Sequence, residues 1–291
     1  MKYIYFLALI YLFSSCKSDL DLIVPSSSPG AAGATFFGSE LYYDEKFDIS
    51  YGKDVLQKYD LYIPSTKNTR NPVIVLLHPG AWRIGDKSQL NSIVKGFTAK
   101  RVNCAIVNVN YRLTSFLGVT YKQQLDDINT VLKKIKKDSY ELGISSDNFY
   151  LVGISSGGHL ALLYANSPLG DRLAKGVGAV VPPVNLVAPS MRNGNIGSDV
   201  LKYIGKSFTV SPDEYYENSP VFKFNFASPP AIVFFGGKDE TVPLDQSEFC
   251  KQTLLSSRAK SEYYFYPNQP HEWNIWDETI DKLVNFAQKN L

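Results

Sequence analysis

The stretch FYLVGISSGGHLALL at residues 149–163 decides the fold. It begins as an apolar run typical of a buried strand and ends as an Ala- and Leu-rich segment typical of a helix. Between the two lies Gly-Ile-Ser-Ser-Gly at residues 153–157, a G-x-S-x-G pattern. Glycines allow the sharp turn and close packing that lift a serine hydroxyl above a sheet. The pattern therefore predicts Ser155 as a nucleophile. A glycine-rich turn without chemistry is the alternative.

Strand-like runs and helix-like segments alternate over the rest of the chain. We expect strands at residues 58–63, 73–77, 104–109, 149–152, 177–181, 231–235 and 263–266. A helix is expected at residues 123–137, where apolar side chains recur at helical spacing. This alternation indicates an α/β fold with a mainly parallel central sheet and helices on both faces. Ligands of such sheets bind outside the carboxyl ends of the strands.

A serine needs a base to remove its proton, and the chain holds three histidines. His159 follows Ser155 by four residues on the expected helix, so we expect its side chain to point along that helix. His78 ends another expected strand and belongs to a different motif. His271 follows the last expected strand, where a loop can carry an imidazole back over the site. We therefore predict His271 as the base; a solvated loop histidine is the alternative.

The imidazole in turn needs a carboxylate that fixes its tautomer. Asp239 follows the expected strand at residues 231–235 and lies between Ser155 and His271 in the sequence. Glu240 is the competing carboxylate, and a charge that faces solvent is the alternative for both. The position of Asp239 near the strand end favours it.

A negatively charged tetrahedral intermediate needs N–H donors that are already in place. The backbone N–H of Ser156, directly after the nucleophile, is one candidate. The loop HPGAWRIGDK at residues 78–87 follows another expected strand and offers the N–H groups of Gly80 and Ala81. Pro79 has no N–H to donate. A plain glycine turn is the alternative for this loop.

These motifs together resemble the α/β-hydrolase superfamily, in the branch of serine esterases with an HGGGW-like loop. That branch includes hormone-sensitive-lipase-like carboxylesterases, kynurenine-formamidase-like enzymes and feruloyl or acetyl-xylan esterase relatives. The resemblance rests on residues 78–87, 110–112, 153–163, 219–220, 229–230 and 237–246 and on His271. It implies the α/β-hydrolase fold, the triad Ser155, Asp239 and His271, and an oxyanion hole at Gly80, Ala81 and Ser156. The chain differs from the family at Pro79 and Ala81, where glycines are usual, and at Ser156, where alanine is common.

The same resemblance implies a small cap at about residues 185–226. Its aromatic residues are expected either to line an acyl or aromatic pocket or to pack internally: Tyr203, Phe208, Tyr215, Tyr216, Phe222 and Phe224. Trp82 and Trp273 flank the candidate site, and the same two alternatives apply to them.

The first residues resemble a bacterial lipoprotein signal. A short apolar run after Lys2 leads to the sequence LFSSC, which ends at Cys16 and resembles a lipobox. We predict a signal peptide at residues 1–15, lipidation at Cys16, and a Pro-, Ser- and Gly-rich tether at residues 16–35. An ordinary signal peptide is the alternative. One hydrolase domain is expected over residues 36–291, held in the bacterial cell envelope.

Composition removes several other classes of function. Lys and Arg number 30 against 28 Asp and Glu, and the net charge of +2 gives no sign of a nucleic-acid binder. Cys104 and Cys250 are expected to be buried thiols, since a disulfide-stapled fold needs more cysteines. The sequence holds no Cys/His cluster with zinc spacing and no nucleotide-binding glycine motif, so we expect no metal and no cofactor.

The sequence therefore predicts a serine hydrolase that cleaves carboxylic esters through an acyl-enzyme on Ser155. The substrates are expected to be small esters or esters borne on polysaccharides. Two alternatives stay open: an amide hydrolase with the same triad, and a hydrolase-fold binding protein without turnover. The acyl and alcohol specificity, the membrane leaflet and the oligomeric state do not follow from the sequence.

Overall fold

The computed structural model describes residues 41–291, apart from the side chains of residues 170 and 171. The predicted signal peptide at residues 1–15, the lipidation site Cys16 and the tether at residues 16–35 lie outside the described residues. None of the helices within residues 41–291 has both the length and the apolar character needed to cross a bilayer.

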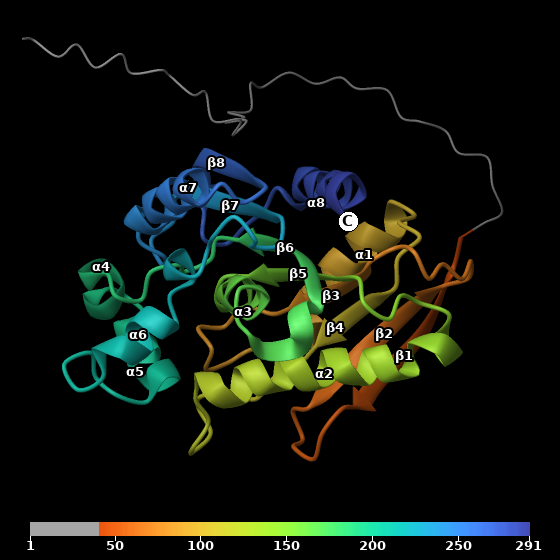
Figure 1. Ribbon diagram of the computed structural model, residues 1–291, viewed down its shortest axis with the longest axis horizontal. Helices are drawn as coiled ribbons and strands as arrows, with labels where there is room; N and C mark the ends of the chain where they lie inside the picture. Colours follow the sequence, from red (N-terminus) through yellow and green to blue (C-terminus); the bar gives the residue numbers. More distant parts are fainter. Residues whose placement is uncertain (1–40) are drawn as a thin grey trace, which may run out of the picture.

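Within the described part of the chain, eight strands form a single sheet in the order β1-β2-β4-β3-β5-β6-β7-β8 (Figure 1). The strands are β1 Tyr43–Ser50, β2 Lys58–Pro64, β3 Val73–Leu77, β4 Ile106–Val109, β5 Phe149–Ile154, β6 Ala174–Val180, β7 Ala231–Lys238 and β8 Ser261–Pro270. β2 pairs antiparallel with both β1 and β4, and every other pair is parallel. The prediction of a mainly parallel central sheet is confirmed.

Helices cover both faces of this sheet, as predicted. α1 (Asn91–Ala99) and α8 (Trp276–Asn290) contact each other and pack on one face. α2 (Tyr121–Leu142), α3 (Ser156–Ala165) and α7 (Asp245–Ser257) contribute to the core on the other face. The short 3-10 helices are η1 Lys87–Leu90, η2 Leu169–Arg172 and η3 Pro220–Phe222.

The observed strands differ from the prediction in one additional strand and in the bounds of several others. β1 was not expected, because its sequence YDEKFDIS is mostly polar and its side chains are largely exposed at the sheet edge. β4 begins at Ile106, two residues later than predicted. β7 and β8 run past their apolar segments, because each pairs with the other as far as Lys238 and Pro270. Pairing between neighbours extends these strands where hydrophobic pattern gives no signal.

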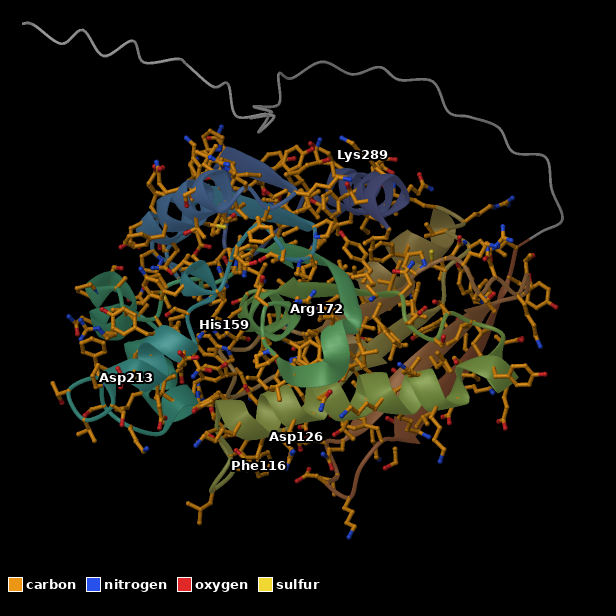
Figure 2. All side chains as sticks on the ribbon, viewed as in Figure 1. Phe116, Asp126, His159, Arg172, Asp213 and Lys289 are labelled. Carbon is orange, nitrogen blue, oxygen red and sulfur yellow. The ribbon has the colours of Figure 1, made fainter. Side chains whose placement is uncertain are left out.

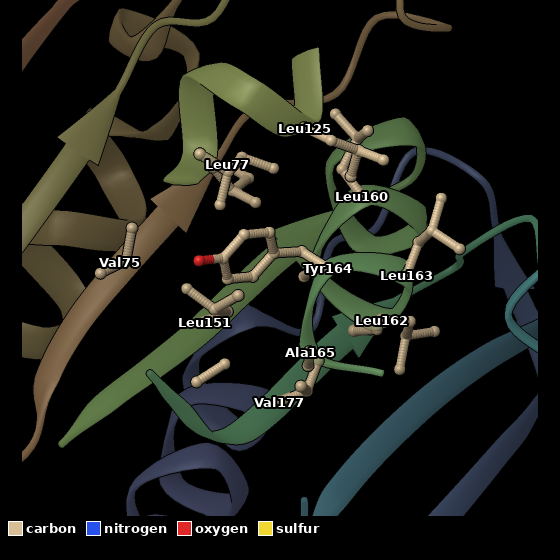
Figure 3. Packing of buried hydrophobic residues seen from close by; sticks show 14 of the residues in the cluster. Val75, Leu77, Leu125, Leu151, Leu160, Leu162, Leu163, Tyr164, Ala165 and Val177 are labelled. Atoms are coloured by element: carbon tan, nitrogen blue, oxygen red, sulfur yellow. The ribbon is translucent and has the colours of Figure 1, made fainter. Parts of the chain in front are cut away.

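Helix α3 lies in the centre of the molecule, and all of its residues are buried. Figure 3 shows Tyr164 of this helix between Leu77 and Leu151 of the sheet, and Leu160 beside Leu125 of α2. The Tyr164 hydroxyl donates a hydrogen bond to Asn129 Oδ1 at 3.1 Å. Full burial of a leucine or aromatic side chain contributes roughly 1.5–3 kcal/mol. The helix is therefore fixed firmly against the strands that precede and flank it.

Glycines allow the first turn of α3 to approach the sheet. A β-carbon on Gly157 would lie 2.2 Å from the carbonyl oxygen of Leu77, at the end of β3. A β-carbon on Gly153 would lie 2.2 Å from the Gly157 carbonyl oxygen. Neighbouring backbone therefore lies where a side chain would be at both positions, which explains the two glycines of the G-x-S-x-G pattern.

A helical insertion at residues 185–226 separates β6 from β7. It holds α4 (Pro189–Asn193), α5 (Gly197–Ile204), α6 (Pro212–Glu217) and η3. Asn218, in this insertion, accepts a hydrogen bond at its carbonyl from His159 of α3, at 2.8 Å. The insertion therefore packs beside α3; its role as a cap stays a prediction.

We predict that Gly157→Ala lowers the free energy of unfolding by about 3 kcal/mol, because the added methyl group must displace the backbone of β3. Gly96→Ala is the matched control, since it is also a helical glycine but its nearest neighbour is the end of the flexible Ile280 side chain. That variant should stay within about 1 kcal/mol of wild type. Urea unfolding measures both values, and equal effects would contradict the proposed packing.

Candidate active site

Ser155 occupies a strained turn between β5 and α3. Its backbone angles are φ 52° and ψ −121°, a region that residues with a side chain rarely adopt. Its N–H donates to the Val180 carbonyl at 2.8 Å, and its own carbonyl accepts from the His159 N–H at 2.9 Å. Such strain costs on the order of 1–3 kcal/mol and persists only where the surroundings hold it. The packing of α3 supplies that support and keeps Ser155 at the carboxyl edge of the sheet.

The register of β7 and β8 places Asp239 beside His271. Lys238 and Pro270 are the last paired residues of these parallel strands, so the next residue of each leaves the sheet at the same point. His271 Nδ1 lies 2.8 Å from Asp239 Oδ2. Glu240 is exposed, so the structure brings Asp239 to the imidazole and leaves its competitor at the surface.

The other nitrogen of His271 faces Ser155. His271 Nε2 lies 3.0 Å from Ser155 Oγ. Because a carboxylate only accepts hydrogen bonds, the contact with Asp239 fixes the proton on Nδ1 and leaves the Nε2 lone pair for the serine hydroxyl. Asp239 Oδ1 accepts the backbone N–H groups of Thr241 at 2.9 Å and Val242 at 2.8 Å. The carboxylate is thus held in place, with 3% of its side chain exposed.

The loop after β3 presents backbone N–H groups near the serine turn. Gly80 has φ 133°, and a β-carbon there would lie 1.9 Å from the Ile84 carbonyl oxygen, so only glycine fits. Ala81 follows at φ 49°. Within residues 41–291, the N–H groups of Gly80 and Ala81 donate to no protein acceptor. Because Gly157 packs on the carbonyls that end β3 and open this loop, the loop begins beside the first turn of α3.

His78, at the start of that loop, fixes the loop to its surroundings through its side chain and its carbonyl. Its ring stacks on Tyr111 with centroids 4.2 Å apart, and the Tyr111 hydroxyl donates to the His78 carbonyl at 2.7 Å. Nδ1 of His78 donates to the Pro79 carbonyl at 2.8 Å, since that oxygen can only accept. Burial lowers the pKa of His78 to about 4. His78 is therefore a neutral buried group, in agreement with its exclusion as the base.

His159 is a second buried support. Trp82 Nε1 donates to His159 Nδ1 at 3.2 Å, so Nε2 carries the proton that binds the Asn218 carbonyl. The Trp82 indole also stacks on Tyr203, with centroids 4.7 Å apart. Burial lowers the pKa of His159 to about 4. Figure 2 shows His159 between α3 and the inserted helices, where its two hydrogen bonds join the loop after β3 to the insertion.

Gln124 and the Arg83–Asp199 ion pair also stabilise the loop after β3. The sequence analysis did not identify any of these three residues. The fully buried Gln124 amide donates to the carbonyls of Trp82 at 2.7 Å and Arg112 at 2.8 Å. Arg83 forms an ion pair with Asp199 of α5 at 2.7 Å. The one sequence feature that could have pointed to Gln124 is that a polar residue lies within the apolar stripe of α2. The ion pair gave none, because its partners are 116 residues apart.

Most of the aromatic residues named as possible pocket walls pack internally. Trp82, Trp273, Tyr203 and Tyr215 are buried. Phe208 and Phe224 are partly buried and pack against the core. The exceptions are Tyr216 and Phe222, which are exposed and have ring centroids 5.0 Å apart. Internal packing, the second alternative from the sequence, therefore applies to all of these aromatic residues except Tyr216 and Phe222.

The expected state of the two other cysteines is confirmed, since Cys104 and Cys250 are both free and buried. Over residues 41–291, no three His, Cys, Asp or Glu side chains are grouped so that they could hold a metal ion.

Comparison with known proteins adds a family assignment. The sequence profile of the family described as BD-FAE matches residues 59–254, a segment that includes Ser155 and Asp239. Versiconal hemiacetal acetate esterase of Dothistroma septosporum is 34% identical over 145 residues, which cover 48% of this chain and 43% of that protein. Isoprenylcysteine alpha-carbonyl methylesterase ICME of Arabidopsis thaliana is 26% identical over 240 residues, which cover 77% of this chain and 55% of that protein. The chain thus spans about half the length of these curated relatives.

Solved structures share the fold. A truncated carbohydrate esterase from gut microbiota superposes with a TM-score of 0.75 at 19% identity, covering 86% of this chain and 96% of that one. The α/β-hydrolase fold expected from the sequence is confirmed.

We predict that His159→Gln reduces the loss of stability in acid. The folded pKa of about 4 lies below the ordinary value of 6.5, so the unfolded chain binds one more proton than the folded chain between these pH values. Stability contributed by neutral His159 is therefore present above pH 6.5 and is lost as the pH falls towards 4.

Glutamine can accept from Trp82 and donate to Asn218 without titrating. The slope of unfolding free energy against pH in this window should decrease by about 1.4 kcal/mol per pH unit. Urea unfolding at several pH values measures it. His78 and the carboxylates contribute equally to both proteins, so an unchanged slope would refute neutral burial of His159.

Proposed function

This chain belongs to the BD-FAE family, and on that premise we propose that it is a serine esterase that cleaves carboxylic esters through an acyl-enzyme on Ser155. The observation that carries the proposal is the contact of 3.0 Å between His271 Nε2 and Ser155 Oγ, with Asp239 behind the imidazole at 2.8 Å. The three groups have the arrangement that activates a serine hydroxyl.

The proposed reaction has two halves. Ser155 Oγ bonds to the ester carbonyl carbon while its proton moves to His271 Nε2. The tetrahedral intermediate then collapses, its bond to the leaving oxygen breaks, and His271 gives that oxygen the proton, so the alcohol departs. Water attacks the acyl-enzyme next and loses a proton to His271. The bond to Ser155 Oγ breaks, the carboxylic acid leaves, and the proton returns to the serine. No cofactor takes part.

The N–H groups of Gly80, Ala81 and Ser156 are proposed to bind the oxyanion of each intermediate. The free donors of Gly80 and Ala81, and the start of α3 at Ser156, support this role. A helix N-terminus carries a partial positive charge that favours an anion. Each such donor contributes about 10²–10³-fold in rate.

Esters are favoured over the two alternatives. The relatives by sequence are named as esterases, which supports an ester substrate over an amide. The assembled Ser155, His271 and Asp239 have no evident purpose in a binding protein without turnover. Small or polysaccharide-borne esters as substrates, the lipid anchor at Cys16 and the cell-envelope location remain proposals that rest on the sequence.

We predict that the full-length protein hydrolyses short-chain aryl esters and that Ser155→Ala lowers kcat by at least about 10⁴-fold, because the nucleophile is lost. A panel of p-nitrophenyl esters from acetate to long-chain acyl groups, run beside matched anilides, measures activity and separates ester from amide preference. Thermal unfolding checks that the variant is folded. Activity that survives in Ser155→Ala would refute the mechanism.

Asp239→Asn should lower kcat by about 10⁴-fold, because an amide at this position no longer fixes the reactive tautomer of His271. Glu240→Gln is the matched control, one residue away and exposed, and should leave kcat within about twofold of wild type. The same ester assay compares the two. Equal losses, or a larger loss in Glu240→Gln, would identify the wrong carboxylate.

A further inference from the structure

A cavity of about 760 Å³ lies at the amino ends of the parallel strands, away from Ser155. Ile74 and Tyr150, near the starts of β3 and β5, line it from the sheet. Tyr150 and Ser155 are five residues apart along β5 and its extension, which corresponds to about 16 Å of extended chain. The cavity is therefore separate from the candidate active site. Its volume lies within the range typical of small-molecule sites, about 300–1,000 Å³.

The inner wall of the cavity is apolar. Helix α1 contributes Phe97 to this wall, and helix α8 contributes Leu283, Val284 and Ala287. Cys104 also lines it as a buried thiol. Such a wall suits a hydrocarbon or aromatic body, whose burial is favourable by about 25 cal/mol per Å².

The rim of the cavity is basic. Arg70, Lys100 and Arg101 line it, and no aspartate or glutamate does. Lys100 is already paired with Asp277 at 2.8 Å and Asp281 at 2.6 Å, so its single positive charge faces two carboxylates and adds no free cation to the rim.

The two arginines differ from Lys100 in this respect. Both are exposed, and neither forms an ion pair with any carboxylate within residues 41–291. A guanidinium binds a carboxylate with two parallel hydrogen bonds, which makes arginine well suited to such a group.

Two buried polar atoms of lining residues have no hydrogen-bond partner among the described residues. They are the Tyr150 hydroxyl and Asn103 Oδ1. The Tyr150 hydroxyl lies 3.0 Å from the position of a β-carbon on Gly178, and the side chain of Leu283, another lining residue, approaches the same point. Buried polar groups are nearly always satisfied by protein, water or ligand. Because neither atom is accessible to solvent, both are enclosed within the wall of the cavity.

We propose that this cavity is a second binding site, specific for a small amphipathic carboxylate whose apolar body packs on the lining side chains of α1 and α8. Arg70 and Arg101 bind the carboxylate at the rim. The apolar wall excludes fully hydrated ions, and the free guanidinium groups disfavour a cation. The site does not depend on the proposed esterase reaction, because none of its residues belongs to the triad or the oxyanion loop.

Isothermal titration calorimetry of the full-length protein with octanoate tests the proposal. We expect one equivalent to bind, and we expect octylammonium of the same length not to bind. The double variant Arg70→Gln/Arg101→Gln should weaken octanoate binding at least about tenfold, because it removes both free cations.

Lys289→Gln is the matched control, since Lys289 is a cation of α8 (Figure 2) and does not line the cavity. Its affinity should stay within about twofold of wild type. A second variant, Val284→Phe, fills the cavity and should also weaken binding, with thermal unfolding as the check on its fold. The proposal is overturned if octanoate does not bind, if octylammonium binds equally well, or if the double variant binds like Lys289→Gln. Failure here would leave ester hydrolysis by Ser155 untouched.

Discussion

The close contact between the first turn of α3 and the end of β3 is the constraint on which the rest of the site depends. Gly157 lies so near the Leu77 carbonyl that no side chain fits between them. This contact holds Ser155 in a backbone conformation with positive φ that an isolated chain would leave at once. It also sets the loop after β3 beside the serine. A single packing contact thus positions both the proposed nucleophile and the proposed oxyanion donors.

The carboxylate Asp239 and the base His271 are positioned in a different way, by the register of two neighbouring parallel strands. β7 and β8 pair as far as Lys238 and Pro270, so Asp239 and His271 emerge together at the carboxyl edge. Backbone N–H groups of residues 241 and 242 then hold the carboxylate. The imidazole needs no long flexible approach to the serine, because strand pairing has already fixed its starting point. Such prior order is what lets a triad act without rearrangement during the reaction.

The two other histidines show how burial changes the use of one residue type. His78 and His159 are enclosed, their pKa values are lowered, and they serve as neutral hydrogen-bonding links for the loop after β3. His271 is partly exposed at the edge of the sheet and faces the serine hydroxyl. At the opposite edge of the sheet, the cavity lined by α1 and α8 has a basic rim and an apolar wall. The same parallel strands therefore carry the candidate active site at their carboxyl ends and the proposed binding site at their amino ends.

The sequence by itself determined the α/β class, the turn at residues 153–157 and the choice of Ser155, Asp239 and His271. These follow from local features, because hydrophobic period, glycine spacing and position after a strand are all written along the chain. Tertiary structure alone decided the edge strand β1, the extension of β7 and β8, and the supports Gln124, Asp199 and Trp82. Each of these depends on a partner distant in sequence: a neighbouring strand that supplies hydrogen bonds, or a side chain that satisfies a buried polar group. No local pattern encodes such a partner, because folding alone brings the two groups together. In the unfolded chain the same polar groups are bound to water instead.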